Sequence, residues 1–289
     1  MRKQFLATMT ALAEKDERVV LILGDIGGFL FRGFAERFPQ RFFNMGICEN
    51  TLVSVAAGLG SQGFIPFVHT IAPFVTERSY EQIKLDLCYN RFPAAIVSCG
   101  ASFDYAWDGA SHHATTDLAI LRLLPGMEVM QPGSPKELDA LLRARYDDGQ
   151  PKYYRLSDHP HGLDLPVEFG RIREVQRRGK ARLTVLTAGP ILGNVVAACK
   201  DLEVNILYTA TIKPFDAAAL ASYRQTKVLV VSDAFGLFEA VAAVPGLRAE
   251  CHGLPDRFFA SYGTVAEIRK SIGLDAEGIR RRVLEAQEG

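Results

Sequence analysis

The sequence of 289 residues lacks an excess of charge of either sign, because Lys and Arg together number 33 and Asp and Glu together also number 33. A surface that binds nucleic acid normally carries a basic excess, so this balance argues against a nucleic-acid-binding protein. A chain without net charge also lacks the long-range repulsion that keeps copies apart, which favours association with other chains.

Cysteine and long apolar runs are also scarce. The five cysteines have no C-x-x-C spacing, and their odd count argues against a disulfide framework or a zinc site. We therefore expect a reducing, cytoplasmic location and no metal site in this chain. No run of about 18 apolar residues is present, so we expect no membrane span. Residues 5–13 instead form an apolar stripe typical of an amphipathic helix rather than a signal peptide.

What the sequence does contain is an alternation of short apolar runs and helical segments. The runs that predict buried strands cover residues 19–23, 42–45, 64–69, 94–98, 128–131, 153–156, 183–188, 204–208 and 228–232. Helical segments between them predict an α/β fold with two doubly wound, mainly parallel sheets. We expect a first domain over residues 1–160, a linker with a small hairpin over 161–180, and a second domain over 181–289.

Three features could carry chemistry, but none is specific by itself. Residues 24–28 form a Gly-rich turn after a strand, yet they match neither G-x-G-x-x-G nor the P-loop, so a plain tight turn is the better interpretation. Glu49 opens a predicted helix at 49–60, where the helix dipole alone stabilises a carboxylate. The polar loop 108–113 holds two adjacent His, whose side chains usually point apart, and this argues against a metal site.

Segments in a fixed order resemble the sequence blocks of transketolases. Residues 43–50 resemble the block "FNxGIAEQN", and residues 63–67 with Phe74 resemble "GxxPfxxtFxxF". Residues 108–127 resemble "DGPSHQxxEDxxxxRxxPNM", and residues 212–216 resemble the "tiKPlD" segment of the same enzymes. The resemblance covers essentially the whole chain and depends on the combination, since each block alone is weak.

This resemblance implies the pyrimidine-binding domain and the C-terminal-like domain of an enzyme that uses thiamine diphosphate. It gives Glu49 a catalytic role, as the carboxyl group that shares a proton with the pyrimidine ring of the cofactor. It makes Phe74 the aromatic side chain that stacks on that ring. Asp25 and Ile47 are further candidates for cofactor binding.

The substrate loop follows from the same resemblance. Asp108 and His112 match residues that contact the hydroxyl groups of the donor sugar, and His112 is expected to help move its protons. The implied reaction is transfer of a two-carbon ketol unit to an aldehyde acceptor.

One block of the family is absent. Transketolases bind Mg²⁺ through a "GDG" segment followed further along by Asn, and the nearest imitation here, residues 24–27, lies in the pyrimidine domain. We therefore expect the small subunit of a split transketolase in an α2β2 assembly. The diphosphate and Mg²⁺ ligands would lie on a separate large, N-terminal subunit.

The residues that hold sugar phosphates in transketolases are largely replaced. Those enzymes use an Arg near the start of this domain, a Ser, a His and a second Arg. Arg2 matches the first, whereas Phe29, Gly100 and Asp158 occupy the other three positions. Because Asp158 would repel a phosphate, we predict a non-phosphorylated or modified acceptor. Arg155, three positions earlier, could supply the missing cation and is a further candidate substrate-binding residue.

Two other functions remain open from the sequence. The beta subunit of a 2-oxo acid dehydrogenase shares this domain order and the cofactor Glu, although the Asp-Gly-Ala-Ser-His loop resembles transketolase. A non-catalytic partner that stabilises an intact enzyme is the second. Substitution of Glu49 separates this scaffold role from both enzyme functions.

Overall fold

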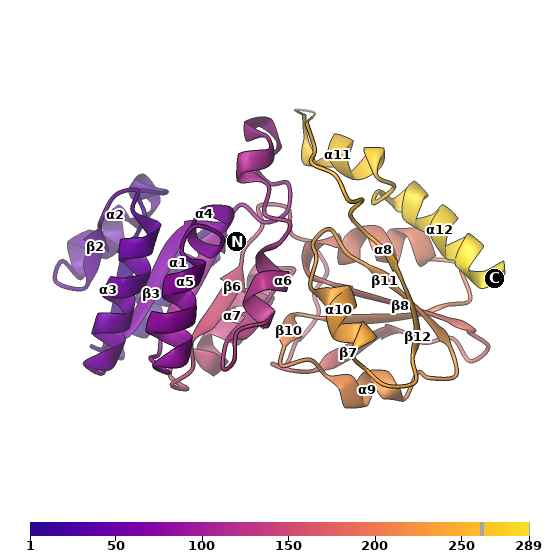
Figure 1. The fold of residues 1–289 in the computed structure, drawn as a ribbon, viewed down its shortest axis with the longest axis horizontal. Helices are drawn as coiled ribbons and strands as arrows, with labels where there is room; N and C mark the ends of the chain where they lie inside the picture. Colours follow the sequence, from indigo (N-terminus) through magenta and orange to yellow (C-terminus); the bar gives the residue numbers. More distant parts are fainter. Residues whose placement is uncertain (261–262, 289) are drawn as a thin grey trace.

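Two mainly parallel sheets lie side by side in the computed structural model, which describes residues 1–260 and 263–288 (Figure 1). The strands of the first sheet are, in order across it, β10 (Thr211–Lys213), β5 (Glu128–Met130), β6 (Lys152–Arg155), β4 (Ala95–Cys99), β3 (Ile65–Ile71), β1 (Val19–Leu23) and β2 (Phe42–Asn44). The strands of the second are β12 (Arg248–His252), β11 (Lys227–Val231), β8 (Leu183–Ala188), β9 (Asn205–Thr209) and β7 (Ile172–Gln176). Only the pairings β10–β5 and β7–β9 are antiparallel among these described strands. The predicted fold class is confirmed.

Helices cover both faces of the first sheet. The helices on one face are α1 (Arg2–Ala13), α2 (Gly28–Arg37) and α7 (Pro135–Arg145). The helical segments on the other face are α3 (Glu49–Ser61), α4 (Ala72–Thr76), α5 (Tyr80–Gln82), the π-helical η1 (Ile83–Tyr89) and α6 (Asp117–Arg122). Because both faces are covered, β1 is apolar and buried at every position. In α1 the buried Phe5, Met9 and Leu12 follow the helical period.

The second sheet is covered in the same way. Helices α8 (Leu192–Cys199) and α12 (Ala276–Glu288) pack together on one face, while α9 (Ala217–Ala221) and α10 (Leu237–Ala242) pack on the other. Helix α11 (Val265–Ser271) lies apart from the sheet, near the top of Figure 1. Apolar side chains of both domains join in the same core clusters, so the two sheets share their packing.

Several sequence predictions are wrong in detail. The hairpin predicted in the linker is absent from 161–180; that stretch instead supplies β7, which pairs with the distant β9. The helical segment expected between the strands at 64–69 and 94–98 is broken into α4, α5 and η1. Strand β12 was missed because its burial is mixed, and α11 was missed although Thr264 and Glu267 form a capping box.

The chain crosses between the two sheets in both directions. Strand β10 comes from the range expected for the second domain, but it forms the edge of the first sheet. This exchange places the carboxyl ends of the second sheet's strands against the first domain: the Phe235 amide, after β11, donates to the Thr115 carbonyl at 2.9 Å. Among the described residues, no helix combines the length and apolar character needed to cross a membrane.

Candidate active site

The predicted site residues lie on loops that follow the carboxyl ends of the first sheet's strands. Asp25 follows β1, Glu49 comes shortly after β2, Phe74 follows β3, and His112 lies in the long connection after β4. Parallel strands place their carboxyl ends at one edge of a sheet, where ligands of α/β proteins bind. The fold therefore brings to one edge residues that are up to 87 positions apart, from Asp25 to His112.

Glu49 is the first residue of α3 and is only 1% exposed. One of its carboxylate oxygens, Oε2, accepts a hydrogen bond from Arg78 Nη1 at 2.7 Å. The Arg78 guanidinium also lies over the Phe74 ring, 4.7 Å from its centre. The Arg78 side chain is 48% exposed. The buried carboxylate of Glu49 and the ring of Phe74 thus both contact the guanidinium of the half-exposed Arg78.

Arg78 was missed by the sequence analysis. It lies four residues after Phe74, a spacing that places two side chains on one face of a helix, and this was the signal available. Its guanidinium is a planar cation that donates to Glu49 while it stacks on Phe74. A protonated aminopyrimidine ring needs the same two contacts. The residues present therefore fit the pyrimidine end of thiamine diphosphate.

The loop after β4 brings His112 to this cluster. The rings of His112 and Phe74 meet edge to face with centroids 4.9 Å apart. His112 Nδ1 lies 3.0 Å from the Ser111 hydroxyl, which orients the ring. Asp108, in the same loop, is exposed. The loop thus presents one carboxylate and one imidazole beside the aromatic face, which is a donor and acceptor set suited to sugar hydroxyl groups.

Asp25 and Ile47 lie at the adjacent strand ends. Asp25 is exposed and has a left-handed backbone with φ of 54°. Its amide donates to Asn44 Oδ1 at 3.1 Å, and Asn44 Nδ2 donates to its carboxylate at 2.9 Å. This reciprocal pair holds the turn, which the sequence analysis had attributed to glycines alone. Ile47 is 72% exposed and contributes an apolar surface beside α3.

A second group of predicted residues lines a cavity of about 620 Å³ beside the start of α1. Its lining includes Arg2, Gly27, Phe29 and Asp158. Arg2 Nη2 and Asp158 Oδ2 form an ion pair at 3.4 Å, and Phe29 is 88% exposed. The cation that the family resemblance assigned to phosphate is therefore already neutralised by a carboxylate of the same chain.

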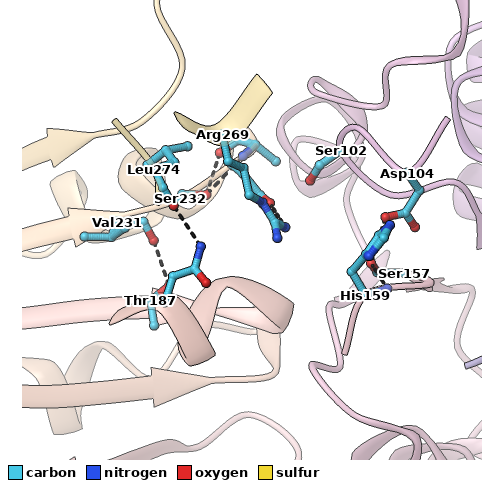
Figure 2. Close-up of polar contacts among 12 residues, drawn as sticks. Ser102, Asp104, Ser157, His159, Thr187, Val231, Ser232, Arg269 and Leu274 are labelled. Atoms are coloured by element: carbon cyan, nitrogen blue, oxygen red, sulfur yellow. Dashed lines mark hydrogen bonds and ion pairs between the residues drawn. The ribbon is translucent and has the colours of Figure 1, made fainter. Parts of the chain in front are cut away.

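Asp104 lies next to Asp158 and holds the backbone at this end of the site. It accepts hydrogen bonds from the Asp158 amide at 2.8 Å and from the Ser157 hydroxyl at 2.9 Å. Figure 2 shows Asp104, Ser157 and His159 grouped on the first-domain side of the junction. Burial raises the pKa of Asp104. A second acidic group so close to Asp158 makes this end still less suited to an anion.

The structure contradicts the expectation that Arg155 contacts substrate. Its side chain is fully buried, and its Nε donates to Asp117 Oδ2 at 2.7 Å. The remaining donors bond Ser102 Oγ at 3.0 Å and the Ala114 carbonyl. Arg155 ends the buried strand β6, whereas Asp158 lies beyond the strand and is exposed, so Arg155 does not share the surface of Asp158.

Gly100, the third replaced position, is also not open to a ligand. Its backbone has φ of 81°, and a Cβ there would lie 2.5 Å from the Tyr105 ring. The histidine of the family would therefore collide with Tyr105 at this position, so the glycine suits the packing of the loop.

A metal ion has no cluster of ligands in the part of the chain that the structure describes: no group of three or more His, Cys, Asp and Glu side chains is arranged to hold one. The cavity and the Glu49 cluster together resemble one half of a cofactor and substrate site.

Comparison with known proteins agrees with this geometry. The model of the transketolase pyrimidine-binding domain matches residues 1–158. The structure of a split-gene transketolase, an inactive β4 tetramer, superposes with a TM-score of 0.88 and 30% identity over 99% of this chain and 98% of that one. The chain therefore belongs to the transketolase family, and the family resemblance inferred from the sequence is confirmed.

Two groups of relatives differ in length. One subunit of the apulose-4-phosphate transketolase of Phocaeicola vulgatus is 29% identical over 98% of this chain and 96% of its own length. A 1-deoxy-D-xylulose-5-phosphate synthase of Oleidesulfovibrio alaskensis is 31% identical over 97% of this chain but only 47% of its own length. The chain thus spans about half the length of the synthases that it matches, and nearly the whole of the transketolase subunit.

Proposed function

We propose that this chain is the small subunit of a split, thiamine-diphosphate-dependent enzyme of the transketolase type, which transfers a two-carbon ketol unit to an aldehyde. The observation that carries the proposal is the cluster of Glu49, Phe74 and His112. A buried carboxylate, an aromatic face and an imidazole meet at the edge of the sheet, with Phe74 in contact with His112 and both Phe74 and Glu49 in contact with Arg78.

Each residue then has a role that its position supports. Thiamine diphosphate bound beside these residues would supply the nucleophilic carbon that the donor ketose needs. Glu49 holds the proton shared with the pyrimidine ring, and its burial excludes water from that proton. Phe74 offers its face to the ring, with Asp25 and Ile47 at the rim. His112 and Asp108 orient the donor hydroxyl groups, and His112 moves protons to and from them.

The proposed enzyme needs a second chain for the other end of the cofactor. We assign the diphosphate and Mg²⁺ ligands to a large, N-terminal subunit, with an α2β2 assembly as the active form. The similar split-gene structure is named an inactive β4 tetramer, which supports self-association without turnover for this chain as well. All five cysteines are unpaired thiols, consistent with the proposal of a reducing cytoplasm.

The acceptor end supports a non-phosphorylated sugar. Arg2 and Asp158 neutralise each other, Asp104 adds a second carboxyl group close by, and Phe29 presents an apolar ring. A phosphate placed here would meet the carboxyl groups of Asp158 and Asp104 and an Arg2 that is already paired, which leaves Lys3 as the other cationic side chain of the lining. An aldehyde with hydroxyl groups would instead find hydrogen-bond donors and acceptors at no electrostatic cost.

A related activity is a second candidate, because synthases of 1-deoxy-D-xylulose 5-phosphate are as similar as the split subunits. That activity would yield a 1-deoxy ketose, whereas ketol transfer leaves a hydroxyl group on the same carbon. A dehydrogenase beta subunit would instead transfer an acyl group to a lipoyl domain. Product analysis separates the three.

Reconstitution tests the proposed function. The chain is expressed with a partner that carries the "GDG…N" block, and ketol transfer is followed with phosphorylated and non-phosphorylated aldehydes in thiamine diphosphate and Mg²⁺. We expect turnover only when both chains are present, with preference for the non-phosphorylated acceptor. Full turnover by this chain alone, or tight Mg²⁺-dependent cofactor binding to it, would contradict the split site. Strong preference for ribose 5-phosphate over ribose would contradict the acceptor class.

A further inference from the structure

The segment from Ser102 to Ala114, called here the 102–114 loop, carries both Asp108 and His112. Its two ends are joined by a pair of backbone hydrogen bonds: the Ser102 amide donates to the Ala114 carbonyl at 3.2 Å, and the Ala114 amide donates to the Ser102 carbonyl at 2.9 Å. The position of His112 therefore depends on what holds this closed base.

The base is held by one buried side chain, Arg155. Its Nη1 donates to Ser102 Oγ at 3.0 Å, and its Nη2 donates to the Ala114 carbonyl. Its Nε donates to Asp117 Oδ2 at 2.7 Å, and that oxygen also accepts the Tyr153 hydroxyl at 2.6 Å. The planar guanidinium thus fixes both ends of the loop and the first turn of α6 in one plane, which a lysine cannot do.

The second domain closes on the same loop. Phe103 and Ala106 of the loop pack in a small apolar cluster with Val265 and Ile268 of α11. The ring of Phe103 also meets that of Phe259 at a centroid distance of 4.9 Å. The loop is therefore clamped between two domains rather than lying free on the surface of one.

A buried ion pair of the second domain faces the base of the loop. Asp233, directly after β11, binds Arg269 Nη2 at 2.6 Å. Figure 2 shows Arg269 reaching from the second domain toward the side on which Ser102 lies. Burial alone would raise the pKa of Asp233, but the charges of Arg269 and Arg155 and hydrogen bonding hold it below its ordinary value. Arg269 lies on α11, whose Val265 and Ile268 pack against the 102–114 loop, so the Asp233–Arg269 pair ties this helix to the end of β11.

We propose that Arg155 and Asp233 are positioning residues, which together lock the 102–114 loop between the domains so that Asp108 and His112 meet the substrate. The second domain then contributes to the reaction without touching substrate. The fully buried ion pair of Arg155 with Asp117 adds little stability compared with apolar packing of the same volume. Its guanidinium instead fixes the orientation of the loop ends, which suits a loop whose first residue, Ser102, has a left-handed backbone with φ of 50°.

The loop carries its own reporter, because Trp107 is the single tryptophan of the sequence and is 64% exposed. Time-resolved fluorescence anisotropy of the full chain therefore measures loop motion without any need for turnover. We expect faster local rotation of Trp107 in R155K, S102A and D233N than in the unaltered chain. Equal local rotation in all four would overturn the proposal.

The matched control is K152M. Lys152 is a buried cation of the same strand, β6, and it donates to Asp148 and to the Gln150 carbonyl. It makes no contact with the loop, and Asp148 keeps Arg145 as a partner at 2.7 Å. K152M should lower the melting temperature without a change in Trp107 rotation. If K152M mobilises Trp107 as R155K does, the effect is general loosening and the proposal fails.

Turnover by the complex with its large partner chain gives a second readout, which relies on the proposed function. We expect R155K to lower kcat by about tenfold to a hundredfold, with an unchanged KM for thiamine diphosphate. In an H112A background R155K should cost less than in the unaltered complex, because only the misplacement of Asp108 remains to be felt. Independent, additive losses would overturn the positioning role. An inactive unaltered complex would overturn the proposed function instead, and the Trp107 measurement would still decide the loop.

Discussion

The two sheets have the same parallel arrangement, but they use the carboxyl ends of their strands differently. At the first sheet this edge leaves polar side chains open to solvent, among them Asp25, Asp108 and Asp158. At the second sheet the equivalent Asp233 is buried and paired with Arg269. The carboxyl edge of the first sheet is open to ligands, whereas that of the second sheet packs against the first domain.

This difference shows how one topology can serve two purposes. Open α/β sheets bind ligands at their carboxyl edge because loops there converge and helix starts point outward. When the same edge is docked against a neighbouring domain, its loops can hold that domain's loops in place. Glu49 and Asp233 illustrate the contrast, since both are buried carboxylates paired with an arginine, but only Glu49 has a partner that is half exposed.

The largest effect is expected at Glu49. In E49Q the side chain keeps its size but can no longer exchange a proton with the pyrimidine ring. We expect turnover by the two-subunit complex to fall by about 10²- to 10⁴-fold, the usual contribution of a positioned acid or base. Steady-state kinetics at saturating thiamine diphosphate measures it.

The control for this variant is E81Q, an exposed carboxylate of the same domain. Its turnover should equal that of the unaltered complex. Full activity of E49Q would favour the scaffold function. It would also remove the contrast between the carboxyl edge of the first sheet, which we propose carries the chemistry, and that of the second sheet, which packs against the first domain.

The next prediction concerns the junction between the second sheet and the first domain, and it uses Tyr208 of β9. Its hydroxyl donates to Glu137 Oε2 at 2.6 Å, and the same carboxylate binds His161 Nε2 at 2.7 Å, so three segments meet at the junction. Y208F should lower the free energy of unfolding by about 1.5–3 kcal/mol, as expected when a hydrogen bond to a charged group is lost. Urea denaturation followed by circular dichroism measures it.

A matched control is Y154F in the first sheet. Tyr154 is equally buried, but its hydroxyl makes only a long bond of 3.4 Å to the Leu141 carbonyl. Its loss should therefore cost less than that of Tyr208. Equal costs for the two variants would mean that the junction is no tighter than the domain interiors.

A pH effect of similar size is expected from His69 on β3. Burial lowers the pKa of His69 to about 4, with its Nδ1 bonded to the Val97 carbonyl at 2.6 Å and its ring between Phe5 and Phe31. The unfolded chain takes up this proton near pH 6.5 and the folded chain only near pH 4. Stability from His69 is therefore complete above pH 6.5 and is lost as the pH falls toward 4.

The comparison is with H69F. Between about pH 7 and pH 5 the unaltered chain should lose about 2 kcal/mol more stability than H69F, from the linkage of one proton. Because Phe removes the hydrogen bond to Val97, only the difference in slope is informative, not the absolute stability. Parallel curves for the two chains would show that folding does not lower the pKa of His69.

The fold was largely predictable because both sheets are covered on each face, so that their central strands are continuous apolar runs. Two edge strands were not predicted from the sequence. Strand β10 has only three residues, and β12 is partly exposed and mixes charged with apolar side chains. Their pairing depends on contacts far along the chain, which no local pattern encodes. The hairpin expected before the second domain failed for the same reason, since β7 pairs with β9 and not with a neighbour.

The family resemblance, and not residue type alone, singled out Glu49 and Phe74. The structure brings the two together through Arg78, and their roles stay predictions. The role of Arg155 was not predictable, because sequence proximity to Asp158 suggested a shared surface, although Arg155 is buried at the end of β6 and Asp158 is exposed beyond the strand. What a buried cation contacts is decided by the other segments around it.

The smallest effect is expected at the acceptor end of the site. Asp158→Asn removes the charge of this side chain but keeps its size, so it tests whether the charge selects the acceptor. Without the carboxylate charge, Arg2 is no longer neutralised and a phosphate no longer meets Asp158. The ratio of kcat/KM for ribose 5-phosphate to that for ribose should therefore rise by about tenfold, which corresponds to about 1.4 kcal/mol. The control is D164N, an exposed carboxylate paired with Lys136, which should leave the ratio unchanged. An unchanged ratio in D158N would mean that the exposed edge selects acceptors by shape alone, with Phe29 as the next residue to alter.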